Sequence, residues 1–285
     1  MRKEHFPDAA QRSQRLRAVT VRGKIESEVI MRFSSLLIPV VLLTLTPAPA
    51  QAQAPKKLLA VGMSSGFQHD SVSDALSTLY QLGKETRLWD TWIRTDVELI
   101  TKKDLKNNAK NLKFFDAVFF MTTGELPLDE SQKADLMSYI KEDGKGFLGA
   151  HNATDTFYKW ADFGEMIGGY FDGHPWNQFL ATIAVTDRST PITAHFPASF
   201  QVTDEIYQIR DFPKDKVRLL MTLDMSKVDR NAKGVKHDAV PITWTKEYGK
   251  GRVFYCGLGH RTEVWERKDV RLMWVEAVKW AMGAR

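Results

Sequence analysis

The sequence predicts an α/β fold built on a doubly wound, mainly parallel sheet, followed by a more β-rich second half. Two observations predict it. Short apolar runs alternate with helical patterns between residues 57 and 150, and this alternation is typical of parallel strands joined by right-handed crossovers. The runs are also apolar throughout rather than at every second residue, as expected for strands that are covered on both faces.

The first half of the chain is expected to supply four strands and two helices. Apolar residues recur at helical spacing in residues 72–82, where Ser71 has the position of an N-cap and Gly83 lies near the end. A second helix is expected at residues 129–141. Uninterrupted apolar runs predict strands at residues 57–63, 97–100, 116–121 and 146–150.

Polar loops follow three of these expected strands. His69 follows the first strand, residues 122–125 follow the third, and His151 follows the fourth. In open α/β sheets, ligands bind outside the carboxyl ends of the strands. We therefore expect all three loops to open on one rim of the sheet.

The second half has more strand patterns than helical ones. A closing helix is expected around residues 270–277, and no repeat or low-complexity linker interrupts the chain, so we expect one domain over residues 55–285. Strands are expected at residues 179–185, 200–209, 217–223, 241–244 and 252–255, the last two joined by a turn at 247–251.

The N-terminal region has the pattern of an export signal. A basic start and a short apolar stretch lead to Ala50-Gln51-Ala52, a small-residue cleavage site. The stretch is too short for a membrane span. We expect residues 31–52 to be a signal peptide cleaved after Ala52, with Ala50 or Ala54 as alternatives, and the mature protein to be periplasmic or secreted.

Thirty residues precede this signal, which would normally begin the chain. We therefore expect Met31 to be the true start and residues 1–30 to come from a misplaced start codon. The chain carries a net charge of +5, of which residues 1–30 contribute +3 and Arg32 contributes one more, leaving +1. No basic stripe remains that calls for nucleic acid, and we expect neither a nucleic-acid partner nor a nucleotide cofactor.

A histidine occupies the bend at the end of the run 146–150. In α/β hydrolytic folds, such a strand-to-helix bend presents a nucleophile, Ser or Cys. An imidazole does not form an ordinary acyl-enzyme, but it can bind a metal or transfer a proton. His151 is therefore the first candidate catalytic residue.

Three further histidines, His69, His174 and His260, also lie beside Gly, Pro or polar turn residues. Imidazole suits zinc-like ions, and three convergent ligands leave a fourth position open for water. The spacing matches no short metal motif, so the fold must bring the ligands together. We predict that His151, His174 and His260 hold a divalent metal such as zinc, while ordinary surface positions remain the alternative.

Carboxylates and aromatic residues near the same loops complete the predicted site. Glu205 and Glu263 are expected to work with His151 and His260 as the catalytic group. Asp155 follows His151 by four residues and could orient it, or could begin a turn. Aromatic faces beside polar groups suit sugar rings, although core packing is the alternative. The predicted substrate-binding residues are His69, Asp155, Trp160 and Trp176.

Several segments together resemble the ThuA-like (trehalose utilisation) family, in order along residues 57–282. The resemblance implies a flavodoxin-like sheet of the class I glutamine amidotransferase-like superfamily and a role in disaccharide or keto-sugar metabolism. The segments are Phe67-Gln68-His69-Asp70-Ser71, Gly149-Ala150-His151-Asn152-Ala153-Thr154-Asp155, Gly168-Gly169-Tyr170-Phe171-Asp172-Gly173-His174-Pro175, Asp204-Glu205-Ile206-Tyr207 and Tyr248-Gly249-Lys250-Gly251-Arg252-Val253-Phe254 leading to Gly259-His260.

The resemblance also assigns roles by position. Amidotransferases of that superfamily use a Cys at the elbow and a downstream His with a nearby Glu. His151 stands at the Cys position, His260 near the catalytic His, and Glu263 near its partner. The change from Cys to His argues against glutamine amide hydrolysis, and the one cysteine, Cys256, lies inside an expected strand as a buried, inert thiol.

The favoured interpretation is an exported enzyme that acts on a small carbohydrate as a metal-assisted hydrolase, lyase or isomerase. A metal-free variant would use His151 as the base. The alternative from another class is a non-catalytic carbohydrate-binding domain on the same scaffold, whose binding would depend on Trp160 and Trp176. A cysteine-type amidase is a third interpretation.

Overall fold

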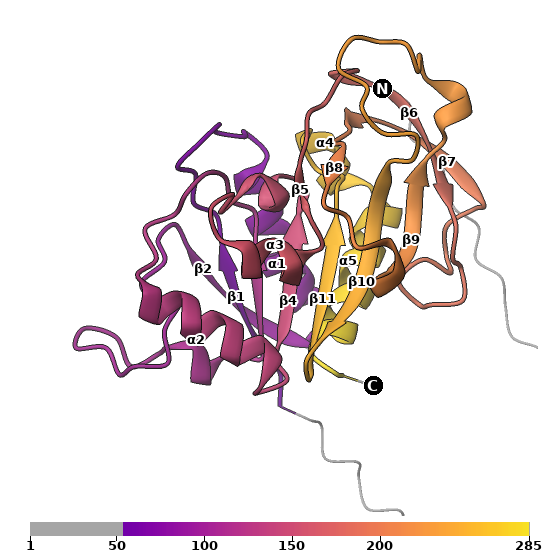
Figure 1. The fold of residues 1–285 in the computed structure, drawn as a ribbon. Coiled ribbons are helices and arrows are strands. Elements are labelled where there is room, and N and C mark those ends of the chain that lie inside the picture. Colours follow the sequence, from indigo (N-terminus) through magenta and orange to yellow (C-terminus); the bar gives the residue numbers. More distant parts are fainter. Residues whose placement is uncertain (1–53, 285) are drawn as a thin grey trace, which may run out of the picture. The chain divides into compact units, whose positions relative to one another are not determined.

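A nine-stranded sheet forms the centre of the protein in the computed structural model, which describes residues 54–284 (Figure 1). A separate two-stranded sheet pairs β5 (Tyr170–Phe171) with β8 (Ile209–Arg210). The strands of the large sheet, in spatial order, are β2 (Trp89–Arg94), β1 (Lys56–Val61), β3 (Ala117–Phe120), β4 (Gly146–Ala150), β11 (Gly251–Cys256), β10 (Pro241–Tyr248), β9 (Arg218–Leu223), β6 (Gln178–Val185) and β7 (Ser199–Glu205).

The first five strands of this order are parallel, and the last four extend the sheet in antiparallel fashion. The order β2-β1-β3-β4-β11 is that of a flavodoxin-like sheet, and it puts the carboxyl ends of all five strands on one edge. The predicted fold class is therefore confirmed, including the β-rich second half.

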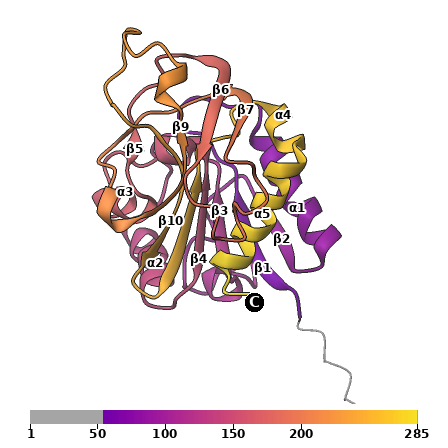
Figure 2. The ribbon, with the colours of Figure 1, turned by 90° about the vertical axis from the view of Figure 1, so that its right-hand side faces the viewer.

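Helices cover both faces of the sheet. Figure 2 shows α1, α4 and α5 on one face and α2 and α3 on the other. The helices are α1 (Val72–Thr86), α2 (Glu130–Lys141), α3 (Ala161–Ile167), α4 (Thr262–Glu266) and α5 (Lys268–Ala281), and the 3-10 turns are η1 (Leu112–Phe114), η2 (His151–Asp155), η3 (Lys214–Lys216) and η4 (Met225–Lys227).

Alternation along the strands divides the core into two layers. Successive strand residues point to opposite faces, so Phe119 packs edge-on against Trp274 of α5 whereas Phe120 packs against Phe147 and Phe163 on the other side. All five of these side chains are fully buried. The strand-end loops lie between these two layers, at the edge of the sheet where the parallel strands have their carboxyl ends.

Two strand predictions were wrong. Residues 97–100 form a turn, and the second strand is β2 instead. Val97, Leu99 and Ile100 are apolar because they pack into the core as a loop, while β2 carries a mixed pattern because it is an edge strand. The run predicted at residues 200–209 is also interrupted, since β7 ends at Glu205 and only β8 continues.

The other expected elements of the described residues are present with small shifts of their ends. The turn predicted at residues 247–251 joins β10 to β11 as an antiparallel hairpin. Among residues 54–284, no helix is both long and apolar enough to cross a membrane. The expected signal peptide and the extension before it lie outside the described residues.

Candidate metal centre

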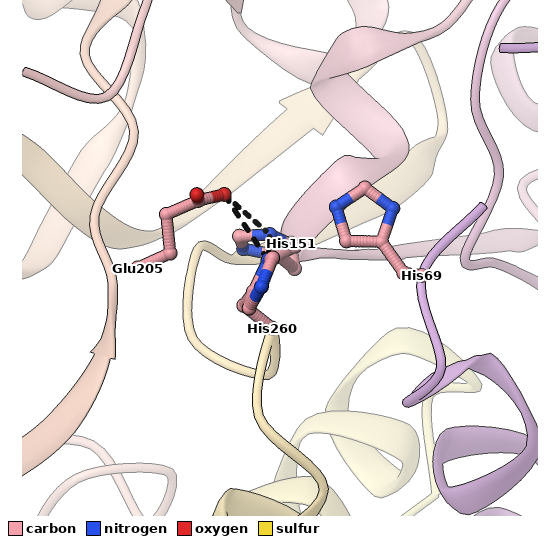
Figure 3. A group of neighbouring side chains, drawn as sticks. All are labelled: His69, His151, Glu205 and His260. Atoms are coloured by element: carbon pink, nitrogen blue, oxygen red, sulfur yellow. Dashed lines mark hydrogen bonds and ion pairs between the residues drawn. The ribbon is translucent and has the colours of Figure 1, made fainter. Parts of the chain in front are cut away.

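Four side chains from distant parts of the chain meet at the rim of the sheet (Figure 3). His69 comes from the loop after β1, His151 follows β4, His260 follows β11, and Glu205 is the last residue of β7. One ligand-type atom from each of the four lies within 4.8 Å of the others. We call these four residues the metal group, because imidazole and carboxylate donors at such separations can surround one divalent ion.

His151 is held with one nitrogen free. It follows β4 directly with φ of +34°, an unusual conformation for a residue with a side chain. Its Nδ1–H donates to the carbonyl of Gly257 at 2.9 Å, so Nε2 is the nitrogen that faces His260 and Glu205. A backbone carbonyl on Nδ1 is a common way of fixing the tautomer of a metal-binding histidine.

The separations between donor atoms match those around a small ion. His260 Nδ1 lies 3.3 Å from His151 Nε2 and 3.1 Å from Glu205 Oε2, and His151 Nε2 lies 3.7 Å from the same oxygen. A tetrahedral zinc ion with bonds near 2.1 Å separates its ligand atoms by about 3.4 Å. The three donors are therefore already spaced for an ion between them.

His69 completes the group from the opposite side. Its Nε2 lies 3.2 Å from the hydroxyl of Tyr207, and its Nδ1 lies 3.1 Å from the amide nitrogen of Asn152. The other amide atom, Asn152 Oδ1, is buried without a hydrogen-bond partner among the described residues. Turning this amide over would let Oδ1 accept the Nδ1–H of His69 and would leave Nε2 to an ion.

The charges of the group are strongly coupled. Burial, reinforced by His151 and His260, lowers the pKa of His69 to about 3, so this imidazole is neutral at pH 7. Burial opposes ionisation of Glu205, but its contacts with His151 and His260 outweigh burial and hold the pKa of that carboxyl well below its usual value. Glu205 in turn raises the pKa of His260 against the effect of burial.

Zinc affinity is therefore expected to fall as the pH falls. An ion can use Nδ1 of His260 only after the proton shared with Glu205 has left. Below the raised pKa of His260, displacing that one proton should weaken zinc binding by about tenfold per pH unit. Calorimetric titration with zinc at pH 5.5, 6.5 and 7.5 measures this slope, and an affinity independent of pH would contradict it.

A buried carboxylate holds the loop that carries His260. The two oxygens of Asp204 accept the backbone N–H groups of Gly259 at 2.7 Å and Arg261 at 3.0 Å, on either side of the histidine. The carbonyl of Gly259 accepts hydrogen bonds from Ser71 Oγ at 2.7 Å and Trp265 Nε1 at 3.1 Å. His260 is thus held in position by both neighbouring peptides.

Asp204→Asn is expected to lower zinc affinity by about 10- to 100-fold, the usual effect of removing a group that orients a metal ligand. The amide has one oxygen where two acceptors are needed, so one of the two N–H groups loses its partner. Zinc titration of both proteins measures the effect. Asp187→Asn on an exposed loop is the control, and equal losses in the two variants would contradict the positioning role.

Two hollows open beside the metal group and share Phe67, His69 and His260. The inner hollow has a volume of about 230 Å³ and is completed by Asp155, Phe171, His174, Glu205 and Tyr207. The outer hollow has a volume of about 380 Å³ and is completed by Gln68, Asp70, Gln178, Arg261, Thr262 and Glu263.

The structure brings together only part of the predicted site. His174 lies outside the metal group, with its Nδ1 3.4 Å from Oε1 of Glu205, the oxygen that faces away from His260. Asp155 lines the inner hollow and Glu263 the outer one. Neither Trp160 nor Trp176 lines either of these two hollows. Trp160 packs on Phe157 and Phe163, and Trp176 donates to the carbonyl of Asp229.

Sequence reasoning missed three residues that shape the site. Asp204 falls on the buried face of β7, where Phe200 and Val202 also point inward. A carboxylate at an alternate position that is otherwise apolar could have been recognised in the sequence as a buried, functional group. Ser71 does occupy the N-cap position of α1, but its hydroxyl bonds Gly259 instead of capping the helix. Tyr207 packs against the ring of His151 in a tilted arrangement, with 4.1 Å between centroids, and no sequence spacing marks it as a site residue.

The fold and the rim site define a flavodoxin-like protein with a histidine-rich group at the strand ends. The family model ThuA (trehalose utilisation) matches residues 57–281, and the chain therefore belongs to this family. The search of curated proteins gave no match.

Solved structures show the same fold. A ThuA-like protein of Bacteroides uniformis is 22% identical, with a TM-score of 0.67 over 83% of this chain and 95% of its own. A ThuA-like protein of Parabacteroides merdae is 19% identical, with a TM-score of 0.63 over 81% and 91%. A cytoplasmic protein of Salmonella typhimurium is 11% identical, with a TM-score of 0.51 over 79% and 98%.

Proposed function

We propose that the protein is a metal-dependent enzyme that acts on a small carbohydrate at the inner hollow. The observation that carries this proposal is the metal group itself: three imidazoles and one carboxylate converge at the wall of a hollow lined by aromatic rings. Aromatic faces pack against the C–H groups of sugar rings. The family description, trehalose utilisation, is in keeping with a carbohydrate ligand.

A divalent ion held by these four donors, with a further coordination position open to the hollow, would polarise a sugar oxygen or lower the pKa of a bound water. The metal would supply this chemistry for a hydrolase, lyase or isomerase reaction. The roles of this chain's residues are to hold the ion through His69, His151, Glu205 and His260 and to orient the sugar beside it. Glu263 lies on the surface of the outer hollow, paired with Arg261, where it can contact the remainder of a longer substrate.

The geometry disfavours the two other interpretations. Cys256 is fully buried in β11, and burial raises the pKa of its thiol to about 11, so it offers no thiolate for an amidase. The binding-domain interpretation depended on Trp160 and Trp176, and neither of them lines a hollow beside the metal group.

We also propose that the protein is exported to the periplasm or secreted, because residues 31–52 have the pattern of a signal peptide. N-terminal sequencing of the protein recovered from outside the cytoplasm tests this. A mature chain that begins after Ala52 is expected, and a chain that retains Lys24 would contradict it.

The function is tested by metal analysis together with turnover. Purified protein is stripped with EDTA, reloaded with zinc, manganese or iron(II), and incubated with trehalose and its keto derivatives while products are followed by NMR. We expect about one ion per chain and turnover that is lost on chelation and restored by reloading. Undiminished turnover in EDTA by protein that binds no ion would contradict the proposal.

A further inference from the structure

The inner hollow has an unusual charge pattern for a sugar site. Two carboxylates, Asp155 and Glu205, line it, and none of its described lining residues is Lys or Arg. Their two negative charges would balance those of a divalent ion held by the metal group. A sugar unit that enters therefore meets no net positive charge that would compensate a phosphate or a carboxylate of its own.

One carboxylate oxygen of Asp155 accepts a hydrogen bond from a side chain, whereas the other has no such partner among the described residues. Oδ1 accepts the hydroxyl of Tyr158 at 2.5 Å, and the backbone carbonyl of Asp155 accepts the N–H of Gly124 at 2.8 Å. Tyr158 itself is packed against Tyr170, with the guanidinium of Arg210 lying over both rings. The carboxylate is thus fixed at the wall of the hollow, with a second oxygen left to accept hydrogen bonds.

The rings around it form an apolar wall. Phe171 lies 4.2 Å from Tyr207 between ring centroids, with the two rings tilted, and 5.7 Å from His174, on which it stacks, so three neighbouring rings line the hollow. Phe67 is 67% exposed and contacts His69 edge-on at 4.9 Å, which places an exposed aromatic face at the mouth. This combination of ring faces and a hydroxyl-accepting carboxylate suits one uncharged sugar ring.

Arg261 of the outer hollow and Lys236 are both engaged in ion pairs. Arg261 pairs with Glu263 at 2.6 Å and with Gln178 at 2.9 Å. Lys236 binds the carboxylate of Asp172 at 2.6 Å. Neither of these cations lines the inner hollow, so neither could neutralise an anionic sugar there.

We propose that the inner hollow selects an uncharged sugar unit, and that Asp155 is the specificity-determining residue that accepts its hydroxyl groups and repels sugar phosphates and sugar acids. The inference rests on the proposed function, because it assumes that a carbohydrate occupies this hollow. Asp155 can accept hydroxyl groups from either kind of sugar, but the phosphate or carboxylate of an anionic sugar adds a like charge in a partly buried space.

Binding of matched neutral and anionic sugars to zinc-loaded protein tests this. The probes are trehalose against trehalose 6-phosphate, and D-glucose against D-glucose 6-phosphate and D-glucuronate, with affinities measured by calorimetry or NMR. We expect each neutral sugar to bind at least about tenfold more tightly than its anionic counterpart. Equal or tighter binding of the anionic sugars would overturn the inference while leaving the proposed function standing.

Asp155→Asn separates the role of this carboxylate from that of the rest of the site. The variant should still bind one zinc per chain. Its affinities for each neutral sugar and the anionic counterpart should differ by no more than about threefold, because the anionic sugars bind more tightly and the neutral sugars more weakly than to the wild type. Asp187→Asn, which removes a carboxylate that lines neither hollow, is the matched control and should keep the wild-type ratio. Unchanged discrimination in Asp155→Asn would refute the role of Asp155. Zinc-loaded wild type that binds none of the sugars would instead defeat the carbohydrate proposal as a whole.

Discussion

His151→Ala is expected to lower zinc affinity more than 100-fold and to abolish the metal-dependent turnover. Natural four-ligand zinc sites are worth about 10–16 kcal/mol, so one ligand supplies about 3 kcal/mol, which corresponds to more than a 100-fold change in the dissociation constant. The orientation of the His151 ring is also fixed, through its Nδ1–H bond to Gly257. Calorimetric titration with zinc and elemental analysis measure the loss.

The control for this variant is His195→Ala. His195 lies outside the metal group, with Nε2 donating to the carbonyl of Asp269, so its removal should leave zinc affinity unchanged. Circular dichroism establishes that both variants are folded. If His151→Ala bound zinc as tightly as the wild type, His151 could not be a ligand and the centre would have to lie elsewhere.

Trp265→Ala is expected to destabilise the protein by about 3–5 kcal/mol, as large-to-small changes of buried tryptophans do. Trp265 is 1% exposed and stacks on Trp274 at 5.4 Å between ring centroids. Its indole N–H also donates to the carbonyl of Gly259. Gly259 has a φ of +124°, and a Cβ added there would lie 2.8 Å from the same indole ring, so the glycine and the indole pack closely. Urea denaturation measures the free energy of unfolding.

Trp265→Phe separates packing from positioning. Phenylalanine keeps most of the apolar contact but cannot donate to Gly259, so we expect a smaller loss of stability together with a fall in zinc affinity. Leu272→Ala, at an exposed position of α5, serves as the control. Trp265→Phe with wild-type zinc affinity would show that the indole N–H does not position the His260 loop.

The parallel half of the fold could be predicted because its strands are buried on both faces. The apolar runs that form β1, β3 and β4 are too short for buried helices and are bounded by turn residues, so a buried strand was the structure they favoured. The edge strand β2 could not be predicted in this way, because only Trp89 of its six residues is buried and its polar residues interrupt the apolar pattern. The core loop at residues 97–100 was mistaken for a strand for the converse reason: burial alone does not require extended backbone.

The candidate site could be predicted as a rim of strand-end histidines but not as a set of ligands. His69, His151 and His260 follow three parallel strands, so the rule for α/β sheets places them together. Glu205 reaches the same point from the antiparallel extension, whose register no local pattern determines. Only the tertiary structure shows that His69 joins this group, whereas His174 contacts Glu205 from outside it.

The central claim is that His69, His151, Glu205 and His260 hold a single divalent ion. Anomalous diffraction at the zinc absorption edge from crystals of the zinc-loaded protein tests it most directly. We expect one peak per chain, within about 2.3 Å of donor atoms from all four residues. A protein crystallised in zinc that shows no peak among these four side chains, or a peak held only by residues outside the group, would contradict the account.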